Sequence, residues 1–102
     1  MSAVMHRVAQ RPGEHDPDFV FWCPGCQFGH GVWVTTTCKS TGAQWQWNGS
    51  MDAPSFTPSI LITGEHGVIC HSFVTDGNIH FGSDCSHALA GTVVKMKEEF
   101  YL

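Results

Sequence analysis

Apolar and polar positions alternate along this chain in short runs that predict β-strands. Phe19–Trp22 and Gly31–Thr37 are rich in aromatic and β-branched side chains, which suit a pleated, half-buried surface. Gln44–Trp47 alternates with a period of two, so both of its tryptophans lie on one face, and an Asn-Gly turn follows. We expect the first two runs to form a hairpin.

The clearest hairpin signal joins Gly67–Thr75 to Asn78–Phe81 through Asp76-Gly77. This dipeptide suits a two-residue turn that needs positive φ. It also sets the register of the two strands. The expected pairs are Thr75 with Asn78, Val74 with Ile79, Phe73 with His80 and Ser72 with Phe81.

The rest of the chain adds shorter elements. Ala53–Ser59 contains two prolines, which cannot donate ladder hydrogen bonds, so we expect an extended connector or an edge segment. Ile60–Thr63 predicts a short buried strand and Thr92–Met96 a last strand. Between them, residues 83–91 predict one short helical turn that Gly91 can end.

Length and charge bound the class of protein. At 102 residues we expect one domain over residues 18–97, a flexible N-terminal arm over 1–17 and a short tail over 98–102. A net charge of −4 with only five Lys and Arg argues against nucleic-acid binding. No apolar run approaches the roughly 18 residues of a membrane span, and the first residues lack an apolar leader. We therefore expect no membrane association and a reducing compartment.

Cysteine use then points to a metal. Cys23 and Cys26 stand three positions apart around Pro-Gly, which lets a tight turn aim both sulfurs at one centre, as in half of a tetrahedral zinc site. An odd total of five cysteines favours thiolates over a disulfide set. A redox dithiol is the weaker interpretation, because such pairs usually open a helix and this pair lies between predicted strands. Cys38 is expected to be a bystander.

The other two ligands must come from distant segments. Neighbours along a strand face opposite sides, so only one of Cys70 and His71 can easily reach a given metal. We prefer His71, because Ile69 and Phe73 on its face would wall a buried site, whereas Cys70 suits the core as a small residue. The expected zinc ligands are Cys23, Cys26, His71 and Cys85, with Cys70 (a four-cysteine site) or His87 as alternatives.

The expected zinc site completes the expected fold class. The chain should be a mainly β domain, a small antiparallel sheet or sandwich-like arrangement of hairpins with one short helical turn, held by a zinc knuckle. A catalytic zinc keeps an open position beside a base. His30, Asp84 and His87 are candidate bases, but carboxylates are few, so we favour a closed structural site.

Several stretches carry a resemblance to a known family. They are Trp22–Cys26 with His30, Trp45–Ser50, Ala53–Ile60, Cys70–Ile79 and Asp84–Gly91. Together they resemble small phage and prophage proteins that often carry the label ammonia monooxygenase. The chain is also similar to small phage domains that join a cysteine knuckle to a Pro-Ser-Ile segment and a later His. The resemblance implies a phage origin and a zinc-binding β domain. It does not imply ammonia oxidation, which calls for copper in a membrane-embedded enzyme rather than sulfur-rich zinc ligands.

These observations favour a binding protein over an enzyme. We expect a non-enzymatic interaction module in which zinc holds the fold and a surface engages a host or phage protein, in the host cytoplasm or on the virion. Two alternatives remain. One is a metal-dependent hydrolase or small-ligand-binding protein that uses His30, His71, Asp84 and His87. The other is a virion structural component.

Overall fold

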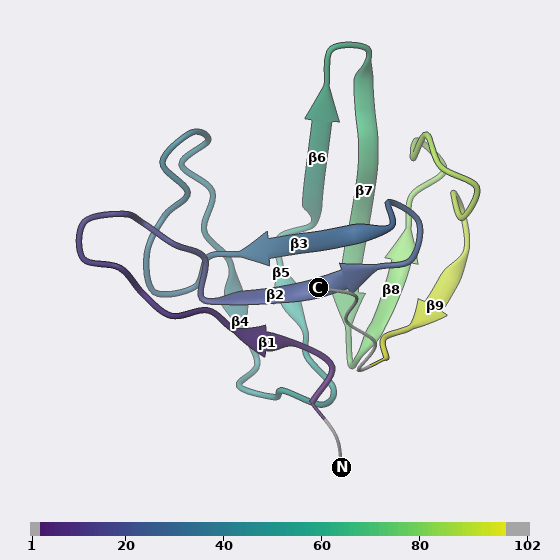
Figure 1. The fold of residues 1–102 in the computed structure, drawn as a ribbon. Coiled ribbons are helices and arrows are strands. Elements are labelled where there is room, and N and C mark those ends of the chain that lie inside the picture. The colour runs from purple at the N-terminus through teal and green to yellow at the C-terminus, as the bar shows by residue number, and fades with distance from the viewer. Residues whose placement is uncertain (1–2, 98–102) are drawn as a thin grey trace.

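Every regular element in the structure, a computed structural model that describes residues 3–97, is a β-strand (Figure 1). The expected mainly β, antiparallel class is therefore confirmed. The strands are β1 (His6–Arg7), β2 (Phe19–Cys23), β3 (Phe28–Val32), β4 (Gln46–Trp47), β5 (Phe56–Thr57), β6 (Ile60–Gly64), β7 (Gly67–Thr75), β8 (Asn78–Phe81) and β9 (Val93–Lys95).

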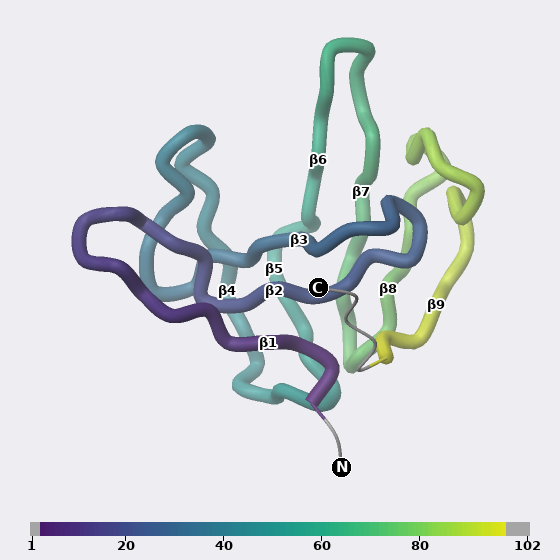
Figure 2. The backbone as a smooth tube through the Cα atoms, in the orientation of Figure 1, coloured from purple at the N-terminus to yellow at the C-terminus, as the bar shows by residue number. Residues whose placement is uncertain are grey.

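The strands form three antiparallel sheets, in the orders β1-β2-β3, β4-β5 and β6-β7-β8-β9. In Figure 2 the β2–β3 hairpin runs across the direction of β6 and β7. Side chains of both larger sheets share one core, in which Phe21 and Val32 meet Ile60, Val74 and Ile79, all fully buried. Burial of these apolar surfaces holds the two sheets together.

The β7–β8 hairpin has the predicted register, from Thr75 opposite Asn78 to Ser72 opposite Phe81. Its turn residues Asp76 and Gly77 have φ angles of 48° and 78°, as a turn of this type demands. Along β7, buried residues alternate with more exposed ones, so that Cys70 is 1% exposed while Phe73 is 50% exposed. One face of β7 therefore lines the core, and the other faces outward.

The β2–β3 hairpin is shorter than its sequence suggests, because β3 ends at Val32. The carboxylate of Asp18 accepts hydrogen bonds from the backbone N–H groups of Val34 and Thr35 and from the Thr35 hydroxyl. These bonds replace strand pairing for that segment. The β-branched residues up to Thr37 favour a strand locally, but the hydrogen bonds to the Asp18 carboxylate override that preference.

Residues 82–92 form consecutive turns in place of the expected short helical turn. Their backbone bonds span three residues, from Cys85 N–H to Gly82 C=O, from Ala90 N–H to His87 C=O and from Thr92 N–H to Leu89 C=O. Such isolated turns close without a continuous helix. In this segment Cys85 is buried, and the side chains of Ser86 and His87 contact Ile69 and Cys70 of β7.

The N-terminal segment expected to be an arm contacts the domain within the described residues. β1 pairs with β2, and the side chains of Val4 and Met5 are buried in the core. Arg11 and Asp16 form an ion pair further along this segment. The predicted tail over 98–102 lies outside the described residues. Within residues 3–97 there is no helix that could span a membrane.

Asp18 gives a prediction about stability and pH. Burial opposes ionisation of this carboxyl, but the hydrogen bonds from Thr35 and Val34 outweigh it and lower its pKa. A carboxyl with a depressed folded-state pKa stabilises the fold above its unfolded pKa of about 3.9, and that contribution is lost as the pH falls through the folded value.

We therefore expect Asp18→Asn to lower the free energy of unfolding by about 1 to 3 kcal/mol at pH 7, as measured by urea denaturation. The difference from wild type should shrink below about pH 4. A difference that stays constant from pH 7 to pH 3 would show that the charge of Asp18 is not what stabilises this segment.

Candidate functional site

Cysteine and histidine side chains from three separate segments gather beside the core. The ligand atoms of Cys23, Cys26, His30 and Cys70 lie within 4.8 Å of one another, and so do those of Cys70, Cys85 and His87. Cys70 belongs to both groups. The described chain therefore brings the β2–β3 knuckle, β7 and the turn segment to one place with the donors of a metal site.

The knuckle has the local geometry of a metal-binding turn. The backbone N–H of Cys26 donates to Cys23 Sγ at 3.4 Å, and that of Gln27 donates to the Cys23 carbonyl at 2.8 Å. A Cβ atom on Gly25 would collide with the imidazole of His87. Glycine between the two cysteines is therefore needed for the close approach of His87.

The electrostatics of the cluster fit a cation. Burial, followed by the nearby thiol of Cys23, raises the pKa of Cys26 to about 11. Burial and the thiols of Cys23, Cys26 and Cys85 together raise the pKa of Cys70. Each thiolate thus repels the next, and a cation among them would reverse that repulsion and favour the ionised, ligating form.

The buried imidazole of His30 is a second feature that fits a metal ion at this cluster. Its side chain is 2% exposed, and its Nε2 atom has no hydrogen-bond partner among the described residues. Burial and the neighbouring His87 lower the pKa of His30 to about 4, which keeps the ring neutral near pH 7. A buried, neutral imidazole nitrogen is costly unless it is bonded, and a metal ion is one such partner.

His71, the ligand preferred from the sequence, is not in either group. Its imidazole lies on the other face of β7, where Nε2 is 2.9 Å from Ser59 Oγ and Nδ1 is 3.1 Å from Asp84 Oδ2. Cys70 instead provides the β7 donor of the cluster. A hydroxyl, an imidazole and a carboxylate in this order form the hydrogen-bonded chain of a Ser-His-Asp triad.

Each member of this chain is held by the fold. Ser59 directly precedes β6, where Leu61 pairs with His71, and its carbonyl accepts a hydrogen bond from Trp45 Nε1 at 3.3 Å. Gly82 N–H donates to the His71 carbonyl at 2.8 Å, and a Cβ on Gly82 would collide with the Asp84 carboxylate. The glycine therefore leaves room for Asp84 beside His71.

The cysteine cluster and the Ser59-His71-Asp84 chain lie on opposite faces of β7. Cys70 and His71 are adjacent on β7, and Asp84 and Cys85 are adjacent in the turn segment. The backbone N–H of His71 also donates to Cys85 Sγ at 3.2 Å. Whatever fixes the positions of Cys70 and Cys85 therefore also restrains the backbone at His71 and Asp84.

The Ser-His-Asp side is open to solvent. The side chains of His71 and Asp84 are 28% and 48% exposed. Ser59 also lines a groove of about 470 Å³. Its walls are formed by Gly31, Trp33, Cys38, Thr41, Ala43, Gln44, Trp45, Pro58, Ser59, Leu61, Ile62 and Thr63.

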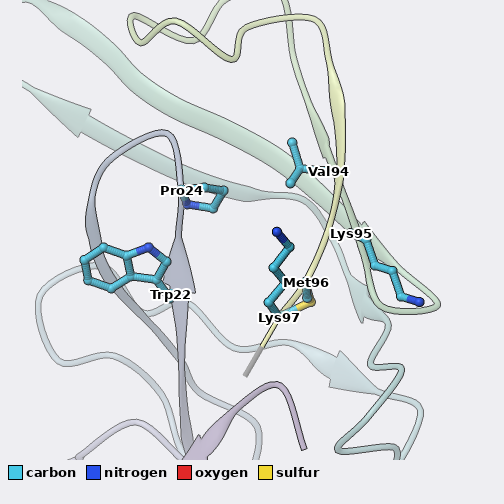
Figure 3. A pocket seen from close by; sticks show the side chains of 6 residues that line it. All are labelled: Trp22, Pro24, Val94, Lys95, Met96 and Lys97. Carbon is cyan, nitrogen blue, oxygen red and sulfur yellow. The ribbon is translucent and has the colours of Figure 1, made fainter. Parts of the chain in front are cut away.

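A second cleft lies between the end of β2 and the last strand (Figure 3). Trp22 and Pro24 face Met96 and its neighbours across it. Its volume of about 80 Å³ is well below the roughly 300 to 1,000 Å³ of ordinary ligand sites. Of these two cavities, the groove at Ser59 is therefore the better candidate for a substrate.

A family model described as bacterial ubiquitination-like system serine protease (BubE) matches residues 3–82. The chain belongs to the BubE family. The BubE match includes Ser59 and His71 and ends two residues before Asp84. The BubE description is that of a protease of a bacterial system, so it supports a small bacterial or phage family without supporting the ammonia monooxygenase label or zinc binding. No curated protein and no solved structure matches the chain.

Sequence reasoning missed Ser59. The residue lies in a segment that two prolines mark as a connector, and no local pattern identifies it as a nucleophile. The available signal was the Pro-Ser-Ile segment that the resemblance pairs with a knuckle and a later His. The sequence indicates Asp84 only as a base near the metal, whereas in the structure it lies on the Nδ1 side of His71.

The cluster predicts which substitutions abolish metal binding. Native mass spectrometry should find about one metal ion per chain in wild type and little in Cys23→Ser or Cys70→Ser, because each removes a ligand from a tetrahedral set. His71→Ala should retain the metal, since its ring faces Ser59 and Asp84. Cys38→Ser is the matched control and should also retain it. Loss of the metal in His71→Ala with retention in Cys70→Ser would contradict this placement.

Proposed function

We propose that this protein is a serine peptidase in which Ser59 is the nucleophile, His71 the general base and Asp84 the group that orients His71. The single observation that carries the proposal is the hydrogen-bonded chain from Ser59 Oγ through His71 to Asp84 Oδ2. The description of the BubE family as a serine protease supports it independently. Substrates would be acyl bonds of proteins handled by a bacterial ubiquitination-like system.

The geometry assigns a role to each atom. The carboxylate of Asp84 accepts a hydrogen bond from Nδ1–H of His71. The proton therefore stays on Nδ1, and the lone pair of Nε2 is free to accept the Ser59 proton. As Ser59 Oγ attacks the carbonyl carbon of the substrate, its proton passes to Nε2. Nε2–H then gives that proton to the leaving group, and an acyl-serine forms. A water molecule deprotonated by Nε2 attacks this ester, which releases the acid and restores Ser59.

We further propose that the cysteine cluster binds zinc through Cys23, Cys26, Cys70 and Cys85. Cys70 takes the place of His71 in the set expected from the sequence, because strand alternation turns His71 away from the cluster. Three of these sulfurs lie within reach of N–H donors, from Cys26, His71 and the His87 ring. Such donors stabilise thiolate ligands from outside the coordination sphere. His30 is the competing fourth ligand, and metal content of His30→Ala decides between them.

The zinc proposed here is structural. Four protein ligands leave no open position for water, so the ion supplies charge neutralisation and a fixed geometry for its ligands. Because Cys70 and Cys85 adjoin His71 and Asp84 in sequence, their fixed positions keep the imidazole and the carboxylate in register. The metal would therefore support the reaction indirectly, by holding the backbone that carries His71 and Asp84.

An interaction module remains the second candidate, favoured by one observation. Phe73 and Val93 are 50% and 60% exposed. The β7–β8 and β8–β9 ladders align both with His80, which puts them on one face of the sheet. Large exposed apolar side chains are typical of protein-binding surfaces. This candidate predicts that wild type and Ser59→Ala bind the partner equally well. It also predicts that wild type leaves the partner chemically unchanged.

The triad predicts a reactive serine. A fluorophosphonate probe should label Ser59 in wild type, because it reacts with a serine activated by an adjacent base. His71→Ala should lower the labelling rate on the order of 10²- to 10⁴-fold, and Asp84→Asn should also lower it. Peptide mapping by mass spectrometry locates the label. Ser40→Ala is the control and should be labelled like wild type, whereas labelling that survives in Ser59→Ala would assign the reactivity elsewhere.

A structural metal predicts tolerance to metal exchange. Removing the metal with a chelator should abolish labelling of Ser59, since His71 and Asp84 lose their support. Reconstitution with either zinc or cadmium should restore it to within about twofold, because a thiolate-rich structural site accepts both soft ions. The alternative of a metal-dependent hydrolase instead predicts that turnover depends strongly on which metal is present.

A further inference from the structure

The groove beside Ser59 is uncharged. None of the residues that form its walls is Asp, Glu, Lys or Arg, although the chain carries fourteen such side chains, nine acidic and five basic. Trp33, Trp45, Pro58 and Leu61 are among the residues that line it. The rings of Trp33 and Trp45 stack with centroids 6.4 Å apart. A charged group placed here would lose hydration without gaining a partner.

The groove also follows a strand that has one free side. β6 is an edge strand of the four-stranded sheet, and three of its residues, Leu61, Ile62 and Thr63, line the groove. Among the described residues, no backbone hydrogen bond outside the β-ladders involves residues 60–64. The open side of such a strand can pair with an extended peptide. Because Ser59 precedes β6, a chain bound along this edge passes the nucleophile.

We propose that this groove is the subsite that receives an uncharged, apolar side chain of an extended polypeptide substrate, on the acyl side of the bond that Ser59 attacks. The inference rests on the proposed peptidase function and names its substrate class. The acyl portion stays attached to Ser59 after the leaving group departs, so the pocket whose wall includes Ser59 is where its side chain lies. A volume of about 470 Å³ is within the range of ordinary ligand pockets.

The test uses 4-nitrophenyl esters of N-acetylated amino acids, which report acyl-side preference through release of 4-nitrophenolate. After correction for spontaneous hydrolysis, kcat/KM for the leucine and phenylalanine esters should exceed that for the aspartate and lysine esters by about tenfold or more. Leu61→Asn should lower this preference several-fold, because it places a polar side chain in the wall. Thr63→Asp, at an exposed position of the same wall, should lower the preference over the lysine ester, because the new carboxylate attracts the lysine ammonium group.

Two controls separate the subsite from the chemistry. Phe28→Asn changes a comparably exposed apolar residue outside the groove and should leave the preference unchanged. Fluorophosphonate labelling of Ser59, which does not need an amino-acid side chain in the groove, should stay within about twofold of wild type in all three variants. Thermal unfolding checks that each variant is folded.

The outcomes are distinguishable. Equal kcat/KM across the ester series in a protein that is labelled at Ser59 would overturn the subsite and leave the peptidase proposal intact. A preference that Leu61→Asn and Thr63→Asp, both folded, do not alter would also overturn it. Absence of labelling at Ser59 would instead overturn the proposed function, and the subsite with it.

Discussion

The alternation of side chains along β7 is the constraint on which both sites depend. Cys70 and His71 are adjacent, so a strand must send one to each face. The buried face carries Cys70 into the cysteine cluster, and the outward face carries His71 to Ser59 and Asp84. Neither residue can exchange roles with the other without a one-residue slip, which would also expose the core side chains of β7.

This arrangement lets one small domain support a demanding geometry. The core is shared by two small sheets, and the segment that carries Asp84 consists of turns. Turns alone hold a carboxylate loosely, whereas a catalytic group needs its position fixed to within a fraction of an ångström. Cys85, next to Asp84, is in contact with the backbone of His71. A metal bound through Cys70 and Cys85 would therefore give two loosely connected segments one rigid point.

Local features of the fold were predictable where local chemistry determines them. Asp76-Gly77 fixed the β7–β8 register, because few other dipeptides accept two positive φ angles. Cys23 and Cys26 were identifiable because residues three positions apart around Pro-Gly lie in one tight turn, which brings their sulfurs together. The choice between Cys70 and His71 was not, since it depends on which face of β7 meets the core. That is decided by packing against core side chains such as Phe21, which lies far away in the sequence.

The nucleophile was hidden for the same reason. Ser59 acquires its role only when β6 pairs with β7 and the turn segment folds back over His71, contacts that span 12 and 13 residues. A serine after a proline in a connector has no local signature of reactivity. The β3 boundary at Val32 likewise depends on Asp18, which caps Val34 and Thr35 from 16 and 17 residues away. Long-range side-chain contacts, rather than propensity, determined each of these features.

One measurement tests the central claim most directly. A crystal structure of the protein after reaction with a fluorophosphonate, with anomalous data collected at the zinc edge, would locate the nucleophile and the metal together. We predict a phosphonyl group on Ser59 Oγ beside His71, and zinc on the opposite face of β7 with Cys70 among its ligands. Zinc bound to a ring nitrogen of His71, with Ser59 unmodified, would contradict the account.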